Sequence, residues 1–525
     1  MNKLYSQFLK FSKKNFRRNL SWLDRDEDSP TFGSFDRNFW HYKTTDFNSD
    51  ILQQGIYTLI GLYKKDIPNN YKKNKIKKLI KASVNFIFKN FENQKFFNEY
   101  YPNENGYPPI AFLSNMLGDV FFDFPEFFKN EKFKINYIKI NIDLSKLSEL
   151  HASNQYSIGL SGLYKFLKFF PEYKKKIQIR NHKKNFLSLQ DKEGWFNEYD
   201  GYDLGYLSIT LESILNIYEI TNDKDFLRAA NLVIKFYSEI IDKDGNFPYT
   251  LNSRNTEYIL PYGFLKAMKF NKKVNSLFYS IYKNFNNSSH FVNAIDDRYT
   301  SHYIFSSFVK SLPYLKKIKN FKKMKFKKNI TLKNAGLIKR FVDKKNITIF
   351  ISILKGGIIR IHDHSKKTVY LQNGYRALDF DKLSTNNFQS KNWRGNIQKR
   401  KFVIIGNFID CRFLEPNTFK HLILRLCSYL FNKKIIKFLK NYIIFNKTNS
   451  KLKFRREIQI GSEITIKDTF IGFKNQFLKL NNKQNLRHVA SADTFSDEDM
   501  IDDISNLKNL QIKNNQFKIV SHFKL

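Results

Sequence analysis

The first part of the chain repeats one pattern, in which apolar side chains recur every three or four positions. In residues 50–64, for example, Ile51, Leu52, Ile56, Leu59 and Tyr63 fall on one helical face. The same spacing predicts helices over 50–64, 75–90, 146–170, 203–220, 225–241, 258–270, 274–287 and 300–314.

Short polar connections separate these expected helices. Thr221 and Asp223, between the helices at 203–220 and 225–241, are both good N-cap residues. Strand patterns are scarce before residue 315, and the helix pairs follow no fixed repeat length. The pattern therefore predicts an N-terminal (α/α) toroid, with a helical solenoid as the alternative.

The spacing of apolar residues changes from a helical period of about 3.6 to a strand period of about 2 after a Lys/Phe-rich stretch at 316–330. We interpret this stretch as a linker. Beyond it, alternating and continuous apolar runs predict strands at 346–354, 357–361, 368–371, 401–408, 456–460 and 463–470. Gly461 and Ser462 form a two-residue connection typical of a β-hairpin. Residues 417–445 are compatible with strands or with a helical insertion that has a basic, aromatic face. We expect a multidomain α + β protein, with a toroid over 1–320 and an antiparallel β-sandwich over 331–525.

Composition narrows the class of protein. Hydrophobic residues make up 42% of the chain, which is enough for large cores. The two cysteines, Cys411 and Cys427, exclude a disulfide scaffold. The N-terminus lacks an apolar run of signal-peptide length, and no uninterrupted apolar stretch reaches the length of a membrane-spanning helix. These features lead us to expect a cytoplasmic protein.

The formal net charge of +42 has two explanations. It indicates an anionic partner, such as an acidic polysaccharide, or it reflects an AT-rich genome that enriches Lys, Asn, Ile, Phe and Tyr at the expense of Gly and Pro. The lysines are spread along the chain, and no Walker, zinc-finger or RNP-like motif is present, so no nucleic-acid partner is expected. Peripheral contact with an anionic membrane remains open, and the oligomeric state is unknown.

Candidate chemistry gathers at junctions between loops and helices. Four segments are rich in Trp, Tyr, Arg, Asn and acidic residues: 31–47, 151–155, 194–207 and 252–263, with a smaller one at 296–299. Aromatic faces stack on sugar rings, while amide and charged groups bind hydroxyls and carboxylates. We therefore expect a sugar cleft whose binding residues are Asp36, Arg37, Trp40, Glu198, Tyr202, Glu257, Tyr258 and Arg298.

The motifs FGSFDRNFWHYKTTDF, HASNQ, GWFNEYDGYDLGYL and SRNTEYILPYG, followed by the expected sandwich, resemble the heparinase II/III-like polysaccharide lyases. The likeness is greatest to a branch found with bacterial surface-polysaccharide genes. The resemblance implies a toroid, a sandwich and cleavage of a uronate-containing polysaccharide by β-elimination. It also implies a role in surface-polysaccharide metabolism.

The resemblance implies roles for five residues. Tyr206 would correspond to the catalytic tyrosine of the family, and Tyr202 is the second candidate for this role. Asn154 and Gln155 fall on an Asn-His pair that binds the sugar carboxylate, with Gln in place of His; His151 is a candidate substitute. Arg254 would bind the substrate carboxylate, unless it pairs with Glu257 instead.

The β-rich part of such lyases carries an HxHxD-like segment that in some members ligates a metal. Residues 360–378 would correspond to it, and His362 and His364 alternate along a strand, so that they share one face. Two histidines are a weak metal pattern, and the spacing differs from that of the motif. We expect no cofactor.

Two other classes of function remain alternatives. A glycoside hydrolase would need two carboxyl groups, for which Glu198, Asp200, Asp203 and Glu257 are candidates. A non-catalytic polysaccharide-binding or assembly factor would keep the cleft without the base.

Overall fold

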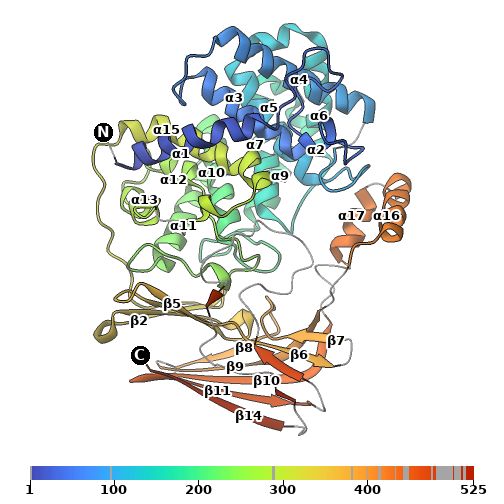
Figure 1. Ribbon diagram of the computed structural model, residues 1–525. Coiled ribbons are helices and arrows are strands. Elements are labelled where there is room, and N and C mark those ends of the chain that lie inside the picture. Colours follow the sequence, from blue (N-terminus) through green and yellow to red (C-terminus); the bar gives the residue numbers. More distant parts are fainter. Residues whose placement is uncertain are drawn as a thin grey trace.

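The protein consists of a helical N-terminal part followed by two antiparallel sheets, as Figure 1 shows. This confirms the predicted fold class. The computed structural model describes residues 3–94, 97–286, 290–379, 382–398, 400–411, 415–431, 433–441, 448–473, 477–480, 500–501, 510–511 and 516–524.

The helical part ends at Lys317. Its α-helices are α1 (Lys3–Leu20), α2 (Arg37–Trp40), α3 (Ile56–Tyr63), α4 (Lys73–Gln94), α5 (Tyr107–Asp123), α6 (Glu131–Ser145), α7 (Ser153–Phe169), α8 (Lys174–Ile177), α9 (Ile179–Leu187), α10 (Leu204–Thr221), α11 (Lys224–Ile240), α12 (Pro261–Ala267), α13 (Val274–Tyr282), α14 (Asp297–Tyr299) and α15 (Phe305–Lys317).

The helices form an inner and an outer layer. Contacts run from α5 to α7, then to α10, α12 and α15, and α15 closes back onto α3. Outer helices α4, α6, α9, α11, α13 and α1 pack against this inner series. This is the arrangement of an (α/α) toroid.

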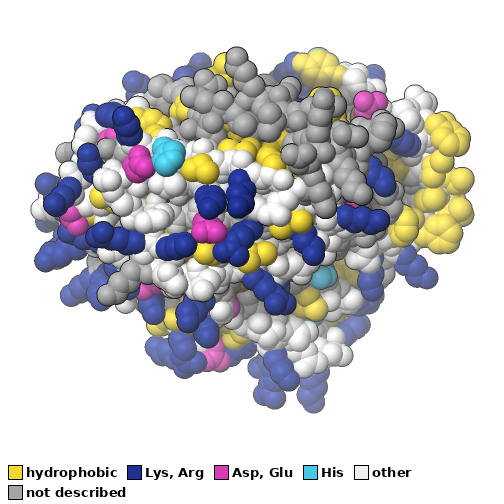
Figure 2. All heavy atoms as spheres, turned by 90° about the horizontal axis from the view of Figure 1, so that it is seen from below, with side chains coloured by type: hydrophobic (Ala, Val, Ile, Leu, Met, Phe, Trp, Pro, Cys, Tyr) yellow, Lys and Arg dark blue, Asp and Glu magenta, His cyan; other side chains and the backbone are white. Residues whose placement is uncertain are grey.

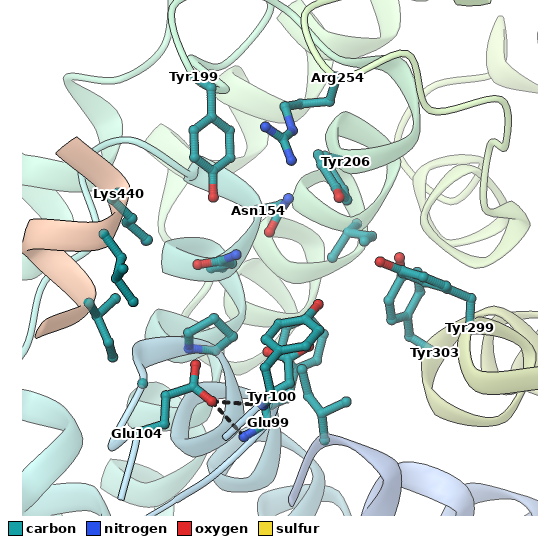
Figure 3. Close-up of a pocket in the computed structure, with 18 of the residues that line it drawn as sticks. Glu99, Tyr100, Glu104, Asn154, Tyr199, Tyr206, Arg254, Tyr299, Tyr303 and Lys440 are labelled. Carbon is teal, nitrogen blue, oxygen red and sulfur yellow. Dashed lines mark hydrogen bonds between the residues drawn. The ribbon is translucent and has the colours of Figure 1, made fainter. Parts of the chain in front are cut away.

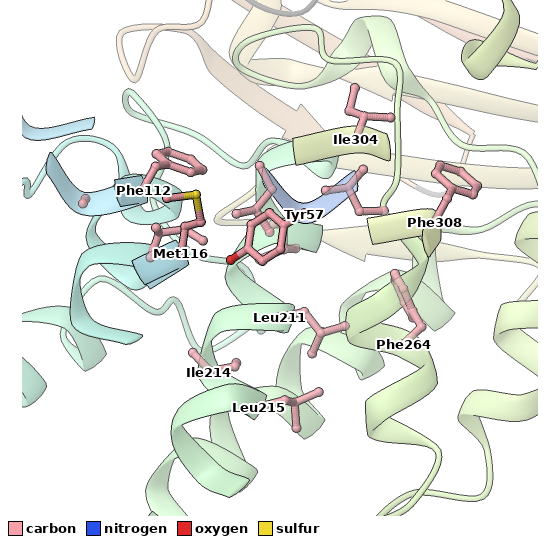
Figure 4. Packing of buried hydrophobic residues seen from close by; sticks show 14 of the residues in the cluster. Tyr57, Phe112, Met116, Leu211, Ile214, Leu215, Phe264, Ile304 and Phe308 are labelled. Carbon is pink, nitrogen blue, oxygen red and sulfur yellow. The ribbon is translucent and has the colours of Figure 1, made fainter. Parts of the chain in front are cut away.

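The two layers differ in sequence for a physical reason. Inner helices α5, α7 and α10 are covered on nearly every side, so most of their residues are buried and apolar or small. Outer helices such as α11 are amphipathic and bury one face. Figure 4 shows the resulting core, in which Met116, Leu211, Phe264 and Phe308 come from four different inner helices.

The second part folds into two sheets. The five-stranded sheet has the order β1-β2-β3-β4-β5, and the nine-stranded sheet has the order β13-β12-β6-β7-β9-β10-β11-β14, with β8 paired to β9. The strands are β1 (Ile330–Leu332), β2 (Leu337–Val342), β3 (Ile347–Ser352), β4 (Ile358–Asp363), β5 (Thr368–Gln372), β6 (Tyr375–Asp379), β7 (Lys382–Thr385), β8 (Arg394–Ile397), β9 (Lys401–Cys411), β10 (Asn449–Ile460), β11 (Glu463–Ile471), β12 (Phe477–Leu480), β13 (Leu510–Gln511) and β14 (Gln516–Lys524).

The five-stranded sheet lies between the toroid and the larger sheet (Figure 1). Phe350 and Ile358 pack into the toroid core, while Ile349 and Ile361 pack against the nine-stranded sheet. Every residue of β3 and β4 is therefore buried, which explains why these strands carry apolar residues on both faces instead of a strict alternation of apolar and polar residues.

Helices α1, α5, α6 and α9 and strands β1, β2, β6–β8 and β12–β14 have no counterpart among the predicted elements, and others differ from the predicted ones in their bounds. The predicted helix at 146–170 begins only at Ser153, because residues 151–152 join a small bridge to the loop before α10. The hairpin at Gly461 and Ser462 is confirmed by the pairing of Ile460 with Ile464. The ambiguous segment 417–445 contains two helices, α16 (Thr418–Phe431) and α17 (Lys433–Leu439), and residues 442–447 lie outside the described residues. Among the described residues, no helix is both long and apolar enough to cross a membrane.

A buried ion pair holds the β-rich part together. The Arg456 side chain is fully buried and donates to both carboxylate oxygens of Asp468 at 2.7 Å and to the Gly357 carbonyl at 2.9 Å. Replacing Arg456 with methionine would leave the Asp468 charge buried without its partner. We expect the free energy of unfolding to fall by about 3–5 kcal/mol, measured by denaturant titration.

The neighbouring Arg455 provides the matched control. It forms an exposed pair with Glu457 at 3.0 Å, so Arg455→Met should change the free energy of unfolding by less than about 0.5 kcal/mol. Equal effects of the two substitutions would contradict the role assigned to the buried pair.

Candidate functional site

A cavity of about 410 Å³ lies where the inner helices begin. An outer helix returns the chain between successive inner helices, so α5, α7 and α10 start at the same end of the toroid. Six tyrosines line the cavity: Tyr100, Tyr101, Tyr199, Tyr206, Tyr299 and Tyr303. Its amide and charged lining residues are Asn154, Gln155, Arg254, Lys440, Glu99 and Glu104 (Figure 3).

The starts of α7 and α10 are tied together by Glu198. Its Oε1 atom accepts hydrogen bonds from the Ser153 hydroxyl at 2.8 Å and from the backbone nitrogen of Asn154 at 2.5 Å. The amide nitrogen of Tyr199 donates to the His151 carbonyl at 2.8 Å. These bonds bring Asn154 and Tyr199, which are far apart in sequence, to one cavity wall.

The backbone of Tyr199 is left-handed, with φ of 49°. A bulky residue rarely adopts this conformation, and such strain is common at functional sites. Burial raises the pKa of Tyr199, while the charges of Lys440 and Arg254 oppose that rise.

Asp203 organises the next wall. It caps α10 by accepting from the Tyr206 amide at 3.1 Å, and its other oxygen accepts from the Arg254 amide at 3.2 Å. Thr256 donates its hydroxyl to the same carboxylate. One buried side chain thus fixes both Tyr206 and Arg254.

The β-rich part supports the loop that carries Arg254. Lys355, between β3 and β4, is buried and donates to the carbonyls of Thr250 and Asn252 and to the Asn255 side chain, at 2.6–3.1 Å. The position of Arg254 therefore depends on contact between the two parts of the chain.

Arg254 lies between two tyrosines, as Figure 3 shows. Its guanidinium carbon is 4.5 Å from the centre of the Tyr199 ring, a cation–π contact. Burial raises the pKa of Tyr206 well above its ordinary range, and the Arg254 charge opposes that rise. Burial works against the charged form of Arg254, but the surrounding tyrosines and carboxyl groups raise its pKa overall.

The opposite wall carries two carboxyl groups. Glu104 accepts hydrogen bonds from the amides of Glu99 and Tyr100 at 2.8 and 2.9 Å (Figure 3). Burial, assisted by the nearby Glu99 charge, raises the pKa of Glu104 to about 7. Burial also raises the pKa of Glu99, which pairs with Arg298 at 3.3 Å.

The helical insertion between β9 and β10 completes the cavity. Ile436 and Leu439 come from α17, and Lys440 directly follows it. Lys440 pairs with Glu149, next to the start of α7. Burial would lower the pKa of Lys440, but Tyr199 and Glu149 raise it above its ordinary value.

Four residues predicted as catalytic line this cavity: Asn154, Gln155, Tyr206 and Arg254. Among the described residues, the Gln155 Oε1 atom has no hydrogen-bond partner. The side chain of His151, the fifth, is exposed and is not part of the lining.

The residues predicted to bind substrate lie behind the cavity or away from it. Glu198, Tyr258 and Arg298 contact lining residues: Tyr258 bonds Tyr303 at 2.7 Å, and Arg298 lies 4.9 Å over the Tyr100 ring. Tyr202 is buried against Trp195 and Phe236. Asp36 caps α2, Arg37 lies over the Tyr42 ring, Trp40 donates to the Trp22 carbonyl, and Glu257 is half-buried outside the lining.

His362 and His364 lie where the β-rich part meets the toroid. His362 bonds Asp242 at 2.5 Å, and His364 bonds Asp244 at 2.8 Å and Thr348 at 2.7 Å. Both histidines thus contact the loop after α11. Within the described residues, no group of three or more His, Cys, Asp or Glu side chains is arranged to hold a metal ion.

Most of the residues that line the cavity have no counterpart among the site residues predicted from the sequence. Glu99, Tyr100 and Glu104 belong to the segment NEYYPNENGYPP before α5, whose density of Tyr, Glu, Pro and Gly at a helix start resembles that of the four predicted segments. Tyr199 lies within one of those segments, but neither the pattern nor the motif resemblance distinguishes it. No sequence pattern around Lys440 predicts a site, because only the folded chain brings this residue to the cavity.

Comparisons with known proteins define the class of fold. No protein-family model and no curated protein sequence matches the chain. Among solved structures, the fold resembles that of a polysaccharide lyase with a helical toroid and β-sandwich.

That structure is the Streptomyces coelicolor A3 chondroitin AC lyase in complex with chondroitin sulphate. The two chains share 8% sequence identity, and their superposition has a TM-score of 0.55. It covers 90% of this chain and 67% of the lyase chain. A mutant of the same enzyme gives 7% identity, the same coverage and a TM-score of 0.50. A heparan sulfate lyase mutant from Pedobacter heparinus gives 12% identity, coverage of 90% and 76%, and a TM-score of 0.37. The conclusion about the fold rests on the first two.

Proposed function

We propose that the protein is a polysaccharide lyase that cleaves an acidic, uronate-containing polysaccharide by β-elimination. The observation that carries this proposal is the grouping of Tyr206, Arg254 and Asn154 on one side of the cavity. The fold resemblance supports the class of reaction, and the surface-polysaccharide setting rests on the motif resemblance alone.

The cationic side chains of the cavity favour an anionic sugar. Arg254 and Lys440 both line it, whereas the backbone amides of Asn154 and Tyr206 at the starts of α7 and α10 already donate to Glu198 and Asp203. The side-chain amides of Asn154 and Gln155 can donate to the uronate carboxylate. This withdraws charge from the carboxylate and stabilises the enolate that forms when the neighbouring proton leaves.

In the proposed reaction, the Tyr206 phenolate removes the proton from C5 of the uronate. The C5–H electrons form the C4–C5 double bond, the C4–O bond breaks, and the leaving oxygen takes a proton from the same phenol. The tyrosine returns to its starting state, so no other reactant is needed. Arg254 stabilises the phenolate by its charge.

The second candidate is a glycoside hydrolase, because Glu99 and Glu104 share the opposite wall. Glu104 has a pKa of about 7, so a large fraction of this carboxyl group is protonated near neutral pH and can act as a general acid. Glu99 would then be the second carboxyl group.

Incubation with a panel of polysaccharides tests the proposal. The panel contains several uronate-containing polymers and neutral polymers of similar length. We expect at least one acidic polymer to be cut, with a rise in ultraviolet absorbance from the unsaturated uronate, and no cleavage of neutral polymers. Cleavage without new absorbance would favour the hydrolase, and binding without cleavage would favour a non-catalytic binding protein.

The pH dependence separates the two candidate chemistries. If the Tyr206 phenolate is the base, kcat/KM rises with pH on the alkaline side, since burial raises the pKa of this phenol and the deprotonated form is the active one. If protonated Glu104 is the acid, the rate instead falls as pH rises through about 7. We expect the alkaline rise, measured as initial rates across the pH range, and a fall near pH 7 would contradict the assignment of Tyr206.

A further inference from the structure

Helix α16 presents an apolar face to solvent. Phe419, Leu422, Ile423, Leu426, Tyr429 and Leu430 are 45–72% exposed. Their spacing places them on one side of the helix, opposite Ser428, which is its buried residue and donates to the Pro102 carbonyl at 2.9 Å. Figure 2 shows hydrophobic side chains gathered at the right edge of the molecule, the side on which Figure 1 places α16 and α17.

The hairpin of α16 and α17 is also strongly basic. Between residues 416 and 441 the sequence contains six Lys and Arg residues and no Asp or Glu. Lys420 and Arg425 lie on either side of the apolar face of α16, while Lys434 and Lys437 are exposed on α17. An exposed apolar face flanked by basic side chains is typical of helices that lie in the plane of an anionic membrane surface.

The dimensions of the hairpin exclude a membrane span. Helix α16 has 14 residues, whereas a span requires roughly 20. Arg425 also remains attached to the toroid through Asp46 at 2.7 Å, so the hairpin is anchored with its apolar face outward. The exposed lysines of the hairpin make pairing with the same face of a second copy unfavourable, because like charges would meet.

We propose that this face of α16 binds the surface of an anionic lipid bilayer, with its apolar side chains in the interfacial region and the exposed Lys420, Lys434 and Lys437 at the headgroups. Since α17 and the residue after it supply Ile436, Leu439 and Lys440 to the cavity, membrane binding holds the candidate site close to the bilayer. This inference does not depend on the reaction that the site performs.

Vesicle flotation of the full chain tests the proposal. Vesicles of phosphatidylcholine with about 30% phosphatidylglycerol are compared with phosphatidylcholine alone, at low and high salt. We expect flotation with the anionic vesicles, weakened by salt. The variant Leu422→Ser/Leu426→Ser/Leu430→Ser should lower the partition coefficient at least about tenfold.

A matched variant changes three exposed apolar residues elsewhere: Ile135→Ser/Ile405→Ser/Val520→Ser. It should float like the unchanged protein, and circular dichroism should show both variants folded. Equal flotation of the two variants, equal binding to neutral vesicles, or no flotation at all would overturn the proposal. A dimer in solution that the α16 variant dissociates would also overturn it, in favour of a second copy as the occupant.

Discussion

Replacing Tyr206 with phenylalanine should lower kcat at least about a thousandfold on a cleaved polysaccharide. The substitution removes only the hydroxyl group that takes and returns the proton, while the ring keeps its contact with Tyr258 at 6.3 Å between centroids. Substrate contacts are otherwise retained, so KM should change little, and kcat and kcat/KM should fall together. Steady-state rates followed by ultraviolet absorbance measure this effect.

Two other tyrosines of the cavity are matched controls. Tyr303→Phe removes a hydroxyl that bonds Tyr258 at 2.7 Å, and we expect a loss of less than about tenfold because this group takes no part in the proton transfer. Tyr199→Phe keeps the ring against Arg254 and tests whether this second phenol beside the guanidinium takes part in the proton transfer. If Tyr199→Phe abolished turnover and Tyr206→Phe did not, the catalytic tyrosine would be Tyr199.

Replacing Arg254 with glutamine should lower kcat/KM by about 100- to 1000-fold. The guanidinium opposes the rise in the pKa of Tyr206, so its loss raises that pKa further and moves the rising limb of the pH profile to higher pH. A full pH profile of the variant measures both changes.

Arg254→Lys is the control, because lysine keeps the charge and loses the planar group that stacks on Tyr199. We expect it to retain more activity than Arg254→Gln, with a smaller displacement of the profile. Thermal unfolding would show whether each variant stays folded, since Arg254 is enclosed by Tyr199 and the loop that Lys355 holds. A rise in KM with an unchanged kcat and pH profile would show that Arg254 only binds substrate.

The fold is predictable where local pattern and packing agree. Helices α10 and α11 match their predicted ranges closely, because Asp203 and Asp223 cap them and their apolar residues recur at helical spacing along the whole length. The start of α7 differs from the prediction, since Leu147 and Leu150 continue the apolar spacing through a segment that the chain uses as a loop. Helix α1 has no counterpart among the predicted helices, because its lysines and arginines obscure the spacing of its buried apolar residues.

The candidate site is predictable only in part, for a similar reason. Asn154, Gln155, Tyr206 and Arg254 stand at loop-to-helix junctions, and toroid geometry brings such junctions together. Other polar junction residues have local structural roles, as when Asp36 caps a helix. Lys440 reaches the cavity from an insertion in the β-rich part, and no local pattern connects it with Tyr206.

Digestion of a cleaved polysaccharide in heavy-oxygen water tests the central claim most directly. β-Elimination breaks the C4–O bond without adding water, so the account predicts that the new non-reducing end is an unsaturated uronate, lighter by one water, and that neither new end carries the label at the moment of cleavage. Mass spectrometry of products from short digestions measures both properties. A saturated non-reducing end, together with one heavy oxygen incorporated per bond cut, would contradict the account and establish hydrolysis.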